Sequence, residues 1–234
     1  MSGDKIEFEV DGTTFELHAE AQGANKRPLV VIAHAWAGQT DTERGWAADL
    51  AEQGYTAVAL DVYGKGVRGN TTEECSALMT PLVEDRDLLL RRLHAGIDAA
   101  KQHAAADGSK VAAIGFCFGG LSVLDLARTG TDLRGVVSFH GLFMPRPNPP
   151  KDVKAKVLIC HGYEDPMADP EAFLGFAKEM NDAGVQWEAH IYGHAKHAFT
   201  NPAANDEQLG TVYHPVAAAR AKTAMTTFLT ELFA

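Results

Sequence analysis

One of the three cysteines lies between two glycines where the sequence pattern changes from strand to helix. Residues 111–114 form a short apolar run, Cys117 follows between Gly115 and Gly119, and apolar residues at helical spacing resume at Leu121. This is the strand–turn–helix pattern of a nucleophile elbow, with Cys in place of the usual Ser. Side chains at the two glycines would collide across so sharp a turn, and the start of a helix favours an anionic thiolate. We therefore predict that Cys117 is a nucleophile; the alternative for such a position is a small buried thiol.

A cysteine nucleophile requires a histidine that accepts its proton and a carboxylate that orients the histidine. In enzymes built around such an elbow, the order along the chain is nucleophile, acid, histidine. Asp165 follows a predicted strand at 156–160, and His197 follows the last predicted strand, at 186–192. We therefore predict a triad of Cys117, His197 and Asp165. The alternative for Asp165 is a turn residue before the proline that follows it.

Other histidines also lie where they could take part in chemistry. Three end predicted strands but precede the nucleophile or the acid in this order, so we expect them to bond to backbone: His34, His140 and His161. His190 and His194, together with His197, raise the alternative of a metal site. Yet His190 falls inside a predicted strand, and the segment lacks the helical H-x-x-x-H spacing of a zinc site. We predict no metal and no cofactor.

Composition bounds the class of protein. The 234 residues are 46% hydrophobic, and α/β folds of this length are commonly one domain, so we predict a single domain over residues 1–234. A net charge of −10 argues against nucleic acid and anionic membranes as partners. The chain has no apolar run of the ~18 residues that a membrane helix needs and no signal-peptide pattern at its start, so we predict a cytoplasmic protein. The odd number of cysteines, without C-x-x-C, indicates neither a disulfide framework nor a zinc knuckle, and the oligomeric state is left open.

The rest of the pattern supplies strands and helices that would position these residues. A hairpin is predicted at 5–10 and 13–19 around Asp11-Gly12, a strong signal for a two-residue turn. Further strands are predicted at 29–33, 55–60, 111–114, 133–139, 156–160 and 186–192, and helices at 40–53, 71–79, 81–106, from 121, at 169–183 and at 212–233. Residues 64–69 match G-x-G-x-x-G, but no apolar helix follows directly, so we assign them to a loop. The alternation predicts an α/β fold with a mostly parallel central sheet, helices on both faces, and reactive side chains at the carboxyl ends of strands.

Five segments resemble motifs of the dienelactone hydrolase family, which has the α/β-hydrolase fold. They are residues 34–38, 54–63, 115–120, 161–166 and 197–199, and the resemblance covers nearly the whole chain. The combination of a cysteine elbow with a later acid and histidine is specific to few families. The resemblance implies that Cys117 is the nucleophile, His197 the base and Asp165 its orienter.

Two positions depart from the family pattern. Ala35 stands where family members carry a glutamate that contacts the resting cysteine, and no arginine follows His197 to bind a substrate carboxylate. Arg86 is a possible replacement for that arginine, but it shares an apolar stripe with Leu89, so we expect a structural ion pair instead, with Asp61. The fold and the triad therefore carry over, whereas the anionic substrate of the family does not.

We therefore predict a hydrolase that cleaves a small ester or lactone through a thioester on Cys117. The backbone N–H groups of Phe118 and Trp36 are expected to hold the oxyanion. Around them we expect a mostly apolar pocket that includes Ala35, Phe143, Met144 and Phe199. Two other classes of function are compatible with the same residues. One is a catalytically idle scaffold that binds a small molecule, and the other is a thiol redox sensor.

Overall fold

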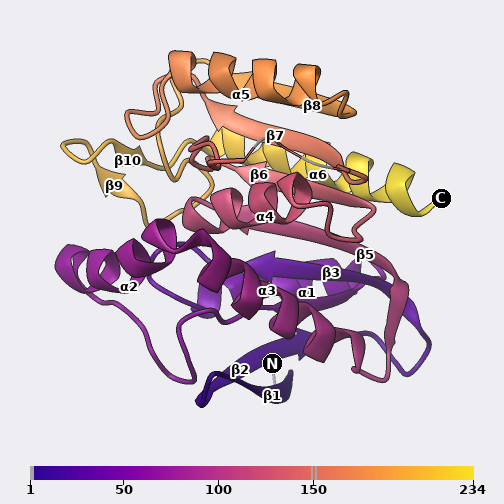
Figure 1. The fold of residues 1–234 in the computed structure, drawn as a ribbon. Helices are drawn as coiled ribbons and strands as arrows, with labels where there is room; N and C mark the ends of the chain where they lie inside the picture. Colours follow the sequence, from indigo (N-terminus) through magenta and orange to yellow (C-terminus); the bar gives the residue numbers. More distant parts are fainter. Residues whose placement is uncertain (1–2, 149, 151) are drawn as a thin grey trace. The chain divides into compact units, whose positions relative to one another are not determined.

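Strands and helices alternate along the chain in the computed structural model, which describes residues 3–148, 150 and 152–234 (Figure 1). Beyond an N-terminal antiparallel hairpin, the pairs β3–β4, β6–β7 and β7–β8 are parallel. This confirms the predicted α/β class with mostly parallel strands. The chain divides into two compact units, Met1–Ala113 and Ile114–Ala234, and the single-domain organisation stays a prediction.

The first unit begins with the predicted hairpin. β1 (Asp4–Val10) and β2 (Thr13–Glu20) pair around Asp11 and Gly12, whose φ angles of 50° and 77° suit a two-residue turn. The strand order in this unit is β1-β2-β4-β3, with β3 and β4 at Arg27–Ala33 and Thr56–Ala59. Nearly every residue of the two parallel strands is buried, as expected of strands that are covered on both faces.

Two helices of the first unit pack on these strands. α1 (Asp41–Glu52) and α3 (Arg86–Lys101) lie on opposite sides of them in Figure 1. α1 begins with a capping box in which Thr40 and Glu43 each satisfy a backbone N–H group of the other. Glu43 is buried and also accepts a hydrogen bond from the N–H of Ala35, at 3.4 Å. The cap therefore ties the start of α1 to the loop that follows β3.

The boundary between the second and third helices differs from its prediction. α2 (Thr72–Glu84) continues through Pro81, where the sequence predicted a new helix to begin. The break falls at Asp85, whose side chain accepts a hydrogen bond from the N–H of Leu88 at 2.8 Å and caps α3. An aspartate that satisfies a helix-start N–H marks this boundary more strongly than the proline does.

The third helix is shorter than predicted. It ends at Lys101 instead of 106, because a turn at His103 leads into β5 (Ala106–Phe116), which is longer than the strand predicted at 111–114. The G-x-G-x-x-G match at 64–69 has no helix or strand, as predicted for a loop. Within the described residues, no helix is both long and apolar enough to cross a membrane. The cytoplasmic location stays a prediction.

The second unit continues from the end of β5 into α4 (Phe118–Arg128). Its other strands lie in the order β6-β7-β8, at Gly135–Phe139, Lys156–Gly162 and Trp187–Tyr192. α5 (Pro170–Asp182) precedes β8, and α6 (Pro215–Phe233) packs on β6 from the side opposite to α4 (Figure 1). The segment after β8 contributes β9 (Asn205–Asp206), which pairs with β10 (Thr211–Val212).

The junction of β5 and α4 provides a first prediction. A Cβ atom at Gly115 would lie 2.1 Å from the carbonyl oxygen of Gly119, so Gly115→Ala should force the turn apart. Because the obstacle is backbone, we expect the free energy of unfolding to fall by more than the ~1–3 kcal/mol of ordinary overpacking. Urea unfolding followed by circular dichroism measures the change. Gly193→Ala is the matched control, since a Cβ there meets nothing within 4 Å; equal destabilisation by the two variants would contradict this account.

Candidate active site

Cys117 lies in the tight turn between β5 and α4. Its backbone has φ 55° and ψ −114°, its N–H donates to the carbonyl of Phe139 at 3.0 Å, and its carbonyl accepts from the N–H of Leu121 at 3.1 Å. A side chain held at positive φ stores strain of a kind that recurs at functional sites. Cys117 is partly exposed, whereas Cys75 and Cys160 are buried, and burial raises the pKa of the Cys160 thiol to about 12. Cys117 is therefore the thiol presented for chemistry.

His197 and Asp165 form a buried hydrogen-bonded pair. Nδ1 of His197 donates to Oδ2 of Asp165 at 2.7 Å, and each residue is only 2% exposed. The other carboxylate oxygen, Oδ1, accepts from the N–H groups of Met167 and Ala168 at 2.8 and 3.3 Å. The two loops meet closely at Gly162, where a Cβ would lie 2.4 Å from a backbone oxygen of the histidine loop. Both carboxylate oxygens are thus held, and they fix the orientation of the ring.

The charge on His197 is coupled to Cys117. Burial alone would lower the pKa of His197, but the negative charge of Cys117 and the hydrogen bond to Asp165 outweigh burial and raise that pKa from 6.5 to about 10. Nε2, the ring nitrogen that Asp165 does not use, is buried and is the nitrogen left for Cys117. The arrangement can hold a thiolate beside an imidazolium and pass one proton, as nucleophilic catalysis by cysteine requires.

A neighbouring acid–histidine pair lies in a different environment. Nδ1 of His194 is 2.8 Å from Oε1 of Glu164, with the side chain of His194 89% exposed. Water screens such a pair, whereas the interior isolates the pair formed by Asp165 and His197. His190, on β8, is also exposed. In the part of the chain that the structure describes, no three His, Cys, Asp or Glu side chains are grouped to hold a metal ion.

Two further histidines adjoin the buried pair, and the sequence did not indicate their place in the site. The ring of His140 meets that of His197 edge-on at 5.1 Å, and its Nε2 shares a 2.8 Å hydrogen bond with the hydroxyl of Thr200, instead of the backbone partner expected. His161 bonds a backbone carbonyl at 2.7 Å, as predicted, and its Nδ1 lies 4.0 Å from Oδ2 of Asp165. Burial lowers the pKa of both rings, well below 6.5 for His140, so neutral rings surround the charged one. Their positions at strand ends were the available signal.

The predicted pocket residues of the second unit occupy different environments. Phe143 is buried, with its ring 4.8 Å from that of His161. Met144 is 44% exposed and can meet a ligand. Phe199 has no exposed surface and packs edge-on against His140 at 5.4 Å. Phe199 therefore has no surface open to a ligand in this structure, and its pocket role stays a prediction.

The predicted oxyanion donors lie in different units. Phe118 is the first residue of α4, and the first turn of a helix directs its N–H groups out of the helix. Ala35 and Trp36 follow β3 in the first unit and are partly exposed. The carbonyl of Trp36 accepts from the hydroxyl of Tyr63 at 3.0 Å, and Nδ1 of His34 donates to the carbonyl of Ala35 at 2.7 Å, the backbone bond predicted for it. The oxyanion and pocket roles stay predictions.

Asp61 has partners that the sequence did not single out. Its carboxylate accepts from the N–H groups of Tyr63 and Gly64, at 3.0 and 3.1 Å, and lies 3.7 Å from Arg68. Arg68 therefore forms an ion pair with Asp61 within the first unit. The ion pair of Asp61 with Arg86, which is buried at the start of α3, stays a prediction.

Known proteins resemble this chain over most of its length. The sequence profile of the dienelactone hydrolase family matches residues 16–233. The crystal structure of a dienelactone hydrolase-like promiscuous phosphotriesterase from metagenomic libraries has a TM-score of 0.95 at 33% identity, covering 99% of this chain and 98% of that one. A probable 2-oxo-3-(5-oxofuran-2-ylidene)propanoate lactonase from Bradyrhizobium is 29% identical over 82% of this chain and 78% of its own. A putative carboxymethylenebutenolidase from Aquifex aeolicus is 26% identical over 94% of both chains.

The raised pKa of His197 predicts how Cys117 reacts with iodoacetamide. Because the imidazolium persists up to about pH 10 and favours the thiolate, alkylation should still be fast at pH 6. In His197→Asn that charge is lost, and the rate should fall about tenfold per pH unit below the ~8.5 of a free thiol. Mass spectrometry of the peptide that contains Cys117 measures both profiles. The same steep pH dependence in the two proteins would contradict a thiolate–imidazolium pair.

Proposed function

Because the chain belongs to the dienelactone hydrolase family, we propose that it hydrolyses a small carboxylic ester or lactone with Cys117 as nucleophile, His197 as base and Asp165 as orienter. One observation carries the proposal. A thiol at positive φ is coupled in charge to a histidine that is hydrogen-bonded to a buried carboxylate. The relatives named as a lactonase and a carboxymethylenebutenolidase support the reaction class.

In the first half of the reaction, the thiolate of Cys117 attacks the carbonyl carbon of the ester. A C–S bond forms, and the carbonyl oxygen takes the negative charge. The N–H group of Phe118, at the start of α4, stabilises this oxyanion, and Trp36 stays the predicted second donor. The C–O bond then breaks, and His197 donates its Nε2 proton to the leaving oxygen, which departs as an alcohol. A thioester and a neutral imidazole remain; with a lactone, the alcohol stays attached to the acyl group.

In the second half, His197 removes a proton from water while the water oxygen attacks the thioester. The C–S bond breaks, the acid leaves, and the thiolate of Cys117 and the imidazolium are restored. Asp165 holds the ring in one orientation through both halves, so the same nitrogen serves as acid and then as base. The steps need no cofactor and no metal.

A second candidate reaction is the hydrolysis of a phosphotriester. It is favoured by the 33% identity and the TM-score of 0.95 to a promiscuous phosphotriesterase. Here the thiolate of Cys117 would attack phosphorus, forming a P–S bond and displacing an aryloxide. Water activated by His197 would then cleave the P–S bond and release the phosphodiester. Sustained release of p-nitrophenol from diethyl p-nitrophenyl phosphate would support this activity. A single burst followed by inactivation would limit turnover to carboxylic esters.

The proposal predicts the effect of removing each residue on the hydrolysis of p-nitrophenyl acetate. Cys117→Ala should abolish turnover, because no nucleophile remains. His197→Ala should lower kcat/KM by on the order of 10²–10⁴, the usual scale for general acid–base help. His194→Ala is the matched control from the same loop and should leave kcat/KM unchanged.

Three results would contradict the proposal. Full activity of Cys117→Ala would require another nucleophile. If the wild type hydrolyses no neutral ester or lactone but peroxide oxidises Cys117 reversibly, the thiol redox sensor is favoured. If neither reaction occurs, the idle scaffold is favoured.

A further prediction concerns substrate charge. The residues after His197 are Ala198, Phe199 and Thr200, which offer no cation. Burying an unpaired substrate carboxylate would cost several kcal/mol, so we expect neutral esters to be preferred over an anionic dienelactone. The measurement compares kcat/KM for p-nitrophenyl acetate and a dienelactone under the same conditions. A dienelactone preference above about tenfold, or ~1.4 kcal/mol, would contradict this prediction, and its loss in Arg86→Met would identify the cation.

A further inference from the structure

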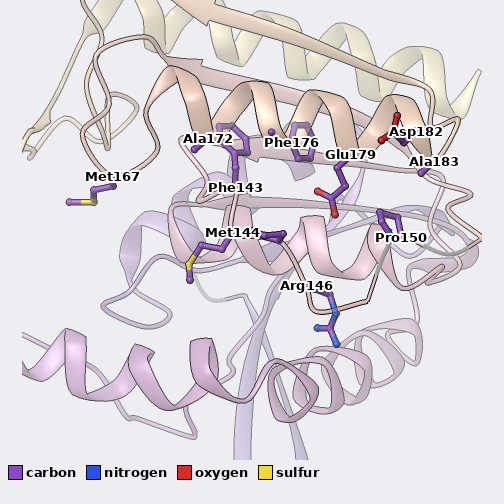
Figure 2. Close-up of a pocket in the computed structure, with 12 residues that line it drawn as sticks. Phe143, Met144, Arg146, Pro150, Met167, Ala172, Phe176, Glu179, Asp182 and Ala183 are labelled. Atoms are coloured by element: carbon purple, nitrogen blue, oxygen red, sulfur yellow. The ribbon is translucent and has the colours of Figure 1, made fainter.

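The mechanism does not use a large cavity that lies within the second unit. A cavity of about 680 Å³ lies between α5 and the segment after β6 (Figure 2). One wall is a face of α5, whose residues recur at helical spacing: Ala172, Gly175, Phe176 and Glu179. Phe143 stacks on the ring of Phe176 at 5.1 Å and closes the opposite side. The volume falls within the ~300–1,000 Å³ of small-molecule sites.

One end of the cavity lies beside the loop that carries Asp165. Met167 lines this end, and its N–H donates to Oδ1 of Asp165 at 2.8 Å. Phe143 lies 4.8 Å from the ring of His161, whose Nδ1 is 4.0 Å from the other oxygen of Asp165. Figure 2 shows Met167 at one end of the lining side chains and Ala183 at the other. The cavity therefore leads away from the acid–histidine pair along α5.

The charged groups beside the cavity are already paired with one another. Glu179 accepts two hydrogen bonds from Arg128, at 3.0 and 2.6 Å. Asp125 is fully buried and accepts from Arg128 at 3.3 Å and from Arg146 at 3.4 Å. Asp182 is paired with the lysine one helical turn before it. The positive charges of Arg128 and Arg146 balance the negative charges of Glu179 and Asp125. The cavity therefore favours a neutral apolar ligand over an ion.

The length of the cavity indicates the shape of that ligand. From Ala172 to Ala183 it follows α5 for roughly 16 Å at the helical rise of ~1.5 Å per residue. We propose that this cavity is a subsite for the apolar acyl chain of a neutral ester whose carbonyl reacts at Cys117. The inference rests on the proposed function and extends it, because it makes medium-chain acyl esters the preferred substrate class.

Chain-length dependence tests the subsite. In the wild type, we expect kcat/KM to be at least about tenfold higher for p-nitrophenyl octanoate than for the acetate, because each methylene removed from water favours binding. Gly175→Leu places a side chain in the cavity, where a Cβ meets nothing within 4 Å. It should lower the octanoate-to-acetate ratio by about tenfold. Leu174→Ala, at the neighbouring exposed position of α5, is the control and should leave the ratio unchanged.

A binding measurement separates failure of the subsite from failure of the proposed hydrolase. Octanamide, titrated by calorimetry into Cys117→Ala, should bind, and adding Gly175→Leu should weaken its binding by about tenfold. If octanamide binds in this way but no ester turns over, the subsite stands and the hydrolase is refuted. If acetate turns over but the wild type shows no chain-length preference, or Gly175→Leu leaves the ratio unchanged, the subsite is overturned and the hydrolase stands.

Discussion

The candidate site depends on the contact between the end of β5 and the start of α4. The Cβ that Gly115 lacks would fall 2.1 Å from the carbonyl oxygen of Gly119, and one on Gly120 would fall 2.6 Å from the Cα of Gly141. Glycines therefore allow the helix to begin immediately after the strand, and this turn holds Cys117 at φ 55°. The thiol is thereby placed at a helix start beyond the carboxyl end of a strand, where the loops after the neighbouring parallel strands also end.

Charge balance explains why the histidine and the acid are buried together. Taking an imidazolium and a carboxylate out of water is costly unless each is paired and hydrogen-bonded. Asp165 meets this condition with three donors, one of them His197 and the others backbone N–H groups. His140 and His161 fill the surrounding space as neutral rings and add no competing charge.

Sequence patterns predicted the turns, because a turn is determined by the few residues that form it. Asp11-Gly12 forms its hairpin turn because few residues accept the required φ angles. The elbow needs its glycines for another reason, since a Cβ at Gly115 or Gly120 would meet backbone atoms. The helix boundary predicted at Pro81 was wrong, because proline is a weaker boundary signal than the aspartate at position 85, which caps the next helix. The neutral state of His140 and its contact with His197 depend on burial and on strands far apart in sequence, which no spacing encodes. The cavity along α5 has the same origin, since its two walls meet only in the folded chain.

The backbone of Ala35, which stands where family members carry a glutamate, is hydrogen-bonded to a glutamate of the same unit. Glu43 is a buried carboxylate that accepts from the N–H of Ala35, and from both the N–H and the hydroxyl of Thr40 at 2.8 and 2.7 Å. A carboxylate with three donors is satisfied where it is and does not need a thiol as a fourth. The loop after β3 is thereby held by its own unit, and the alanine at position 35 brings no carboxylate to it. In the other unit, the pKa of His197 is raised to about 10 by the negative charge of Cys117 and by the hydrogen bond to Asp165, which outweigh burial.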